Sequence, residues 1–131
     1  MGVDREQVSS GSPFERTVGF SRGVRVGRQV AIAGTAPVWP DGDVDPDPLV
    51  QARRCWEIAL DALRSLGGTP DDVIRTRTFL IAPEHEAAGA QAHGELFADI
   101  RPASTMVVVA ALLDGRWKVE VELDAVLPPT T

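Results

Sequence analysis

The sequence predicts an α+β fold, in which two helices pack on one face of a mixed sheet and the elements follow the order β-β-α-β-α-β-β. Three observations lead to this prediction. The segment Asp47–Leu66 has apolar residues at helical spacing. Short apolar segments bounded by turn residues precede and follow it, and the last of them, Lys118–Val126, alternates apolar with mostly acidic residues. The chain of 131 residues also has the length of one domain with a core of its own.

Two strands are predicted before the long helix. Val18–Val26 is rich in strand-forming residues, and a turn at Gly27-Arg28 leads into Gln29–Gly34. The Val-Ala-Ile-Ala run of the second strand is apolar on both faces, which is typical of a strand that is covered on two sides. Proline, glycine and aspartate then break the segment Thr35–Pro48, so we expect an irregular loop there.

Both predicted helices have recognisable boundaries. Asp47 can cap the first helix, Pro48 suits its first turn, and Gly67-Gly68 ends it. Pro83–Phe97 is the second predicted helix, although it contains two glycines, which are weak helix formers.

Three further strands complete the prediction. Val73–Ile81 lies between the helices, and Ser104–Leu112 and Lys118–Val126 follow the second helix, separated by an Asp-Gly turn. The run Met106–Leu113 is apolar on both faces of its strand, so both faces should be buried. In so small a chain the second cover is most simply another copy of the chain, and we therefore expect self-association.

Composition and charge exclude several classes of protein. The chain has 13 Lys and Arg against 19 Asp and Glu, a net charge of −6, and no basic stretch, so we do not expect nucleic acid as a partner. The longest apolar run has eight residues, whereas a membrane-spanning helix needs about 20. We expect no secretory leader, because the polar start of the chain lacks an apolar segment. With its single cysteine, Cys55, the chain fits the cytoplasm.

The chain is predicted to contain one folded unit. Residues 1–15 are polar and are assigned to a flexible lead-in, and residues 16–131 to a single domain.

Several segments, in their order and spacing, resemble the Rid/YjgF family, whose members are small trimeric imine and enamine deaminases and which has also been labelled endoribonuclease L-PSP. The resemblance extends from about Phe20 to Val126. The segments that carry it are Val26-Gly27, Val30–Gly34, Gln51–Arg53, Leu66-Gly67, Asp72–Ile74, Arg101–Met106 and Lys118–Glu122.

The resemblance implies a chorismate-mutase-like fold, a homotrimer and a small-molecule ligand in clefts between subunits. It also implies roles for individual residues. Phe20 stands where the family has a cleft tyrosine, and Gly34 matches a glycine that lets a ligand approach the backbone. Glu120 matches the carboxylate proposed to activate or orient the attacking water, and Met106 matches a position whose backbone groups face the ligand.

The chain departs from the deaminases at Ser104. The resemblance places there an arginine that clamps the substrate carboxylate, so this chain would belong to a subgroup that lacks the deaminase arginine. A charged hydrogen bond contributes about 1.5–3 kcal/mol, and serine carries no charge to replace it. Either the substrate is not 2-aminoacrylate, or another arginine binds its carboxylate. Arg77 and Arg101 are the candidates for that second possibility.

Other interpretations of the same residues stay open. Glu120, Glu122 and Asp124 follow one strand face and can equally form a solvated surface. They stand about 6.6 Å apart, too far to converge on one metal ion, so we predict no metal site there. We expect no cofactor. Ser104 can bond to backbone, and His93 can be a packed helix residue. The resemblance implies hydrolysis of a small imine or enamine as the function, and a non-catalytic metabolite-binding trimer is the alternative. Ribonuclease activity fits the charge least well.

Overall fold

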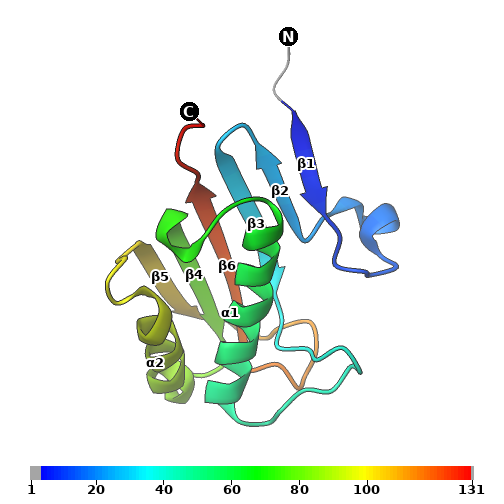
Figure 1. Ribbon diagram of the computed structural model, residues 1–131. Coiled ribbons are helices and arrows are strands. Elements are labelled where there is room, and N and C mark those ends of the chain that lie inside the picture. The colour runs from blue at the N-terminus through cyan, green and yellow to red at the C-terminus, as the bar shows by residue number, and fades with distance from the viewer. Residues whose placement is uncertain (1–3, 131) are drawn as a thin grey trace.

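A computed structural model describes residues 4–130 and contains six strands and two main helices (Figure 1). Three short helical turns, Glu15–Gly19, Pro70–Asp72 and Pro83–His85, lie between these elements. The elements are β1 (Arg5–Val8), β2 (Gly23–Val26), β3 (Gln29–Thr35), α1 (Pro48–Ser65), β4 (Val73–Leu80), α2 (Glu86–Phe97), β5 (Ala103–Val108) and β6 (Val119–Val126).

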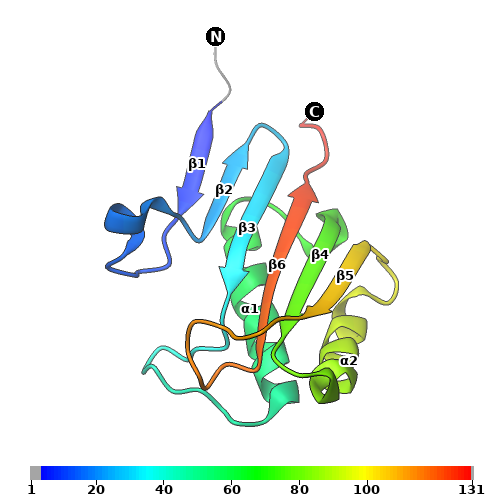
Figure 2. The same cartoon turned by 180° about the vertical axis from the view of Figure 1, so that it is seen from behind.

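All six strands form one mixed sheet in the order β1-β2-β3-β6-β4-β5. Neighbouring strands are antiparallel except β4 and β5, which are parallel and joined by α2. Both helices lie on one face of the sheet (Figure 1). Among residues 4–130 no helix covers the opposite face, the bare face, which Figure 2 shows from behind. The predicted α+β class, the mixed sheet and the placement of the helices are confirmed.

The first helix begins and ends as its sequence predicts. The Asp47 carboxylate accepts hydrogen bonds from the backbone N–H groups of Leu49 (2.8 Å) and Val50 (3.2 Å). Gly67 follows the helix with a φ of +95°, a conformation that favours glycine.

The core lies between the helices and one face of the sheet. Alternate residues of β6, from Val119 to Ala125, are buried, whereas the acidic residues between them face the bare side. Trp56 of α1 and Phe97 of α2 pack edge to face, with ring centroids 5.2 Å apart. Cys55 is fully buried nearby, and burial raises the pKa of its thiol, so it is a core residue.

The prediction of a flexible lead-in over residues 1–15 is wrong for part of that segment. Residues 1–3 lie outside the described residues, but Arg5–Val8 forms β1, which pairs antiparallel with β2. Strands pair through main-chain groups, so a segment with three exposed polar side chains can join a sheet. Such a segment lacks the apolar pattern from which a strand is predicted.

Two predicted strands have different limits. The first begins at Gly23 rather than Val18, because residues 15–19 form a helical turn. The strand predicted over Ser104–Leu112 is β5, which ends at Val108 and is followed by an irregular loop. In the single chain Val107 and Val108 are 41% and 50% exposed, so the expected burial of both faces is not met within one copy.

Candidate functional site

An open cleft of about 800 Å³ lies beside the C-terminal half of β3, beyond the last residue that pairs with β2. Its walls come from the N-terminal segment, one side of α1, and the loops that follow β3 and β5. The lining includes the side chains of Phe20, Arg22, Trp39, Trp117 and Glu120, together with Gly34. Three residues that the sequence resemblance singled out, Phe20, Gly34 and Glu120, thus lie in one cleft.

Glu120 and Gly34 meet at an irregularity in the sheet. The register between β3 and β6 shifts between Ile32 and Thr35, and this bulge brings Gly34 against Glu120. A Cβ atom on Gly34 would overlap with the carboxylate Oε2 of Glu120. The Glu120 carboxylate therefore occupies the space that a side chain at position 34 would fill.

The carboxylate of Glu120 is half-buried. Burial raises its pKa above the ordinary value, and the neighbouring Glu122 carboxylate acts in the same direction, while the Arg22 guanidinium opposes the rise. Among the described residues no hydrogen bond or ion pair to Glu120 within the usual distances is found. A carboxylate in this state is available to a ligand or to water.

Arg22 is a cleft residue that sequence analysis missed. Its Nη1 donates hydrogen bonds to the Gly34 carbonyl (2.9 Å) and to Thr35 Oγ1 (2.8 Å), and so holds the bulge in place. Burial lowers the pKa of Arg22, and attraction to Glu120 opposes that change. No sequence pattern predicts this contact, because it depends on the bulge in β3 and on the point where the pairing of β2 with β3 ends.

Two tryptophans complete the cleft. The guanidinium of Arg54 lies 4.3 Å from the ring centroid of Trp39, and its Nε donates to the Val38 carbonyl (3.1 Å). The indole N–H of Trp117 is buried and has no partner among residues 4–130. Both rings are therefore placed where a bound molecule would change their environment.

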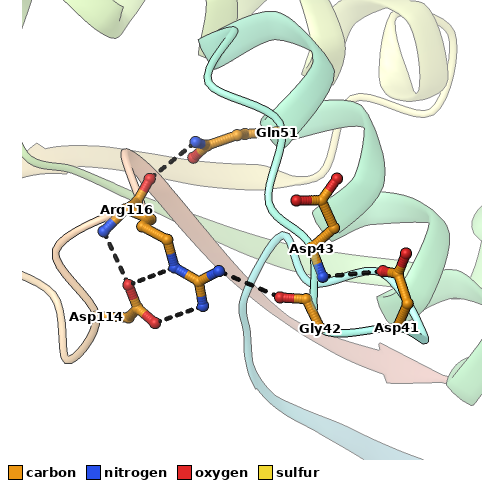
Figure 3. A network of polar contacts seen from close by, with 6 residues as sticks. All are labelled: Asp41, Gly42, Asp43, Gln51, Asp114 and Arg116. Atoms are coloured by element: carbon orange, nitrogen blue, oxygen red, sulfur yellow. Dashed lines mark hydrogen bonds and ion pairs between the residues drawn. The ribbon is translucent and has the colours of Figure 1, made fainter.

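The loops that carry these tryptophans are held by the buried side chain of Gln51. Its Nε2 donates to the carbonyls of Asp45 (2.8 Å) and Arg116 (2.9 Å), and its Oε1 accepts from the Lys118 N–H (2.7 Å). Figure 3 shows the contact to Arg116, whose guanidinium in turn bonds to the Gly42 carbonyl (3.2 Å). One amide on α1 thus ties the two cleft loops to each other.

A second branch of the network in Figure 3 fixes the turn before β6. The Arg116 guanidinium pairs with the carboxylate of Asp114 at 2.8 Å and lowers the pKa of that carboxyl to about 2. The same carboxylate accepts from the Arg116 backbone N–H at 2.8 Å.

The other predicted site residues lie elsewhere in the chain. Ser104 and Met106 of β5 point toward α2, on the sheet face opposite Glu120. Met106 packs beside Gly89, and the Ser104 hydroxyl is 3.5 Å from Nε2 of His93. That imidazole is 2.8 Å from the Thr76 hydroxyl, and burial lowers its pKa. Within one chain these residues do not share a cleft with Glu120.

Neither arginine that the sequence offered as an alternative clamp lines the cleft. Arg77 lies on the bare sheet face, where its Nη1 is 3.2 Å from Glu122 and 3.5 Å from Asp124. Arg101 is exposed in the connection between α2 and β5, with a φ of +58° that is unusual for a residue other than glycine. Their charges are therefore paired or remote.

Residues 4–130 contain neither a metal-ligand cluster nor a membrane-spanning helix. No group of three or more His, Cys, Asp or Glu side chains is placed to hold a metal ion. No helix in the same residues has the length and apolar character needed to cross a membrane.

Comparisons with known proteins agree with this architecture. The family described as Endoribonuclease L-PSP matches residues 11–127. An uncharacterized protein of Streptomyces coelicolor, SCO2049, is 38% identical over 122 residues, which are 91% of this chain and 90% of that protein.

Solved structures show the same fold. Rv2704 from Mycobacterium tuberculosis, described as a member of the YjgF/YER057c/UK114 family, is 37% identical with a TM-score of 0.86 over 95% of this chain and 100% of its own. E. coli TdcF with bound serine is 23% identical, with a TM-score of 0.81 over 98% and 99% of the two chains, and supports the fold alone. The extent of these matches shows that the chain belongs to the endoribonuclease L-PSP family, also called the YjgF or Rid family.

Proposed function

We propose that the protein hydrolyses the C=N bond of a small imine or enamine and releases a carbonyl compound and ammonia. The observation that carries the proposal is the Glu120 carboxylate, half-buried, unpaired among the described residues and facing an open cleft. Membership of a family that contains imine deaminases supports the same reaction.

The reaction asks little of the protein. An enamine first tautomerises to the imine. The oxygen of water then forms a bond to the imine carbon while the C–N π electrons move to nitrogen, and Glu120 would accept a proton from this water and return it to the nitrogen, which gives a carbinolamine. In the second step Glu120 would transfer the remaining hydroxyl proton to the nitrogen in the same way, as the C=O bond forms and the C–N bond breaks to release ammonia. A raised pKa suits this exchange, because the carboxyl then gains and loses a proton closer to neutral pH.

A homotrimer is the second part of the proposal. Members of the family are typically homotrimers, and the single chain leaves apolar side chains exposed at Ile74 (53%), Val107 (41%) and Val108 (50%). In such an assembly Ser104 and the Met106 backbone of one copy would complete the Glu120 cleft of another. We also propose the cytoplasm as its compartment, since the single cysteine is a buried thiol.

Sedimentation equilibrium tests the assembly. We expect a mass three times the 14.0 kDa of one chain. Val107→Asp, which places a charge on the exposed apolar surface, should reduce this mass to that of one chain. A wild-type monomer at micromolar concentration would contradict the proposed trimer.

Ammonia release tests the activity. Imines are generated in situ from amino acids and from simple amines, and their hydrolysis is followed with the protein and in buffer. We expect acceleration for at least one member of the panel. No acceleration across the panel would favour the alternative, a trimer that binds a small metabolite without turnover.

Gly34→Ala is expected to slow the hydrolysis at least tenfold and to leave the fold intact. The added Cβ meets the end of a flexible side chain, so the Glu120 carboxylate swings away while the backbone keeps its place. Ammonia release and a thermal melt would be compared with those of Gly94→Ala, where the Cβ has no atom within 4 Å. Equal activity of Gly34→Ala and wild type would show that the position of the carboxylate is irrelevant.

A further inference from the structure

Arg22 lines the cleft, and one side of its guanidinium makes no hydrogen bond to the described residues. Within the described residues, each hydrogen bond of this side chain comes from Nη1, which donates to the Ala33 and Gly34 carbonyls and to the Thr35 hydroxyl. An arginine has five N–H donors, and three of them belong to Nε and Nη2. Among the described residues these three have no partner within hydrogen-bonding distance.

The free side is the one that recognises carboxylates. Nε and Nη2 present two parallel N–H groups whose spacing matches the two oxygens of a carboxylate. Because Nη1 is fixed by acceptors on β3, the orientation of this fork is set before any ligand arrives. Little conformational entropy therefore remains to be lost on binding.

The neighbouring charges leave Arg22 available. Glu120 attracts the guanidinium, yet no ion pair within 4.0 Å joins the two groups in the described part of the chain. Arg54, the other arginine of the cleft, is engaged by Glu57 (2.5 Å), the Val38 carbonyl and the Trp39 ring. Of these two cleft arginines, Arg22 is therefore the half-buried one whose Nε and Nη2 groups make no hydrogen bond to the described residues.

We propose that Arg22 binds the carboxylate of a small ligand through Nε and Nη2, and so supplies the anion-binding role that Ser104 cannot. The ligand then lies between opposite charges, with its acid group at Arg22 and its electropositive centre toward Glu120. An imine that carries a carboxylate has this charge distribution. The inference rests on the proposed function only for what happens to the bound molecule; the binding itself does not depend on turnover.

Binding of pyruvate and of pyruvamide tests this role. The two probes have nearly the same shape, but only pyruvate is an anion. Trp39 and Trp117 line the cleft, so their fluorescence should report saturation. We expect wild type to bind pyruvate more tightly than pyruvamide, and Arg22→Gln to bind pyruvate ten- to a hundredfold more weakly, with pyruvamide unchanged.

Control variants separate the fork from simple charge. Arg64→Gln removes the same charge from the exposed side of α1 and should bind pyruvate as wild type does. Arg22→Lys keeps the charge without the fork and should fall between wild type and Arg22→Gln. Its melting curve and that of Arg22→Gln show whether the bulge still folds.

Two results would overturn the inference. One is equal pyruvate affinity in wild type and a folded Arg22→Gln; the other is no saturable pyruvate binding by wild type. Failure of the protein to release ammonia, with the Arg22-dependent affinity intact, would instead remove the proposed hydrolysis and leave the anion site standing.

Discussion

Glu120→Gln is expected to reduce the acceleration of imine hydrolysis by about a hundredfold or more, the usual contribution of a positioned proton-transfer group. Glutamine keeps the size of the side chain and its place against Gly34, but it cannot accept a proton from water. The measurement is ammonia release, with Glu122→Gln as the matched control. Glu122 follows on the same strand face, where it pairs with Arg77 (3.2 Å), and should be replaceable without loss of rate.

The same variant has a second consequence for stability. Burial disfavours the charged form of the Glu120 carboxyl and so raises its pKa in the folded state. The protonated carboxyl therefore contributes to the free energy of unfolding, and this contribution is fully present below the unfolded pKa. It is lost as the pH rises through the folded pKa. Glu120→Gln should therefore melt at a higher temperature than wild type at pH 7, and the gain should vanish in acid. A variant with wild-type activity would contradict the catalytic role of Glu120.

Gln51→Leu is expected to destabilise the protein by about 3 kcal/mol, because two carbonyls and one N–H group lose their partner in a buried place. For a domain of this size that corresponds to a decrease in Tm of about 10 °C. The cleft loops should also loosen, since the amide of Gln51 connects them. Thermal denaturation measures the first effect, and amide hydrogen exchange at Lys118 the second.

Gln91→Leu is the control for this prediction. Gln91 is exposed on α2 and makes one long hydrogen bond to Glu95 (3.4 Å), so its replacement should change stability by no more than about 0.5 kcal/mol. If Gln51→Leu had the same Tm as Gln91→Leu, contacts other than those of Gln51 would hold the two cleft loops in position.

The fold was predictable where local chemistry determines it. Asp47 and Gly67 delimit α1 through contacts made within a few residues, and the alternation in Lys118–Val126 follows directly from the two faces of β6. β1 was missed because its pairing with β2 depends on main-chain groups, which leave no trace in the pattern of side chains.

The site was predictable only in part, for a related reason. Gly34 and Glu120 were found through the resemblance to a family, and the structure places them in contact. Arg22 reaches the Gly34 carbonyl across 12 residues and Gln51 reaches the Arg116 carbonyl across 65, and the positions of both carbonyl groups are determined by tertiary structure. Sequence spacing contains no information on such contacts.

β1 has a consequence for the behaviour of the protein at high concentration. It is the outermost strand on its side of the sheet and shows Arg5, Glu6 and Gln7 to solvent. Charged side chains on an outer strand discourage the main chain of another molecule from adding to it. Without these few residues β2, which contains Val24 and Val26, would become the unpaired edge strand of the sheet. The exposed polar side chains of β1 therefore disfavour edge-to-edge pairing of this sheet with the sheet of another molecule.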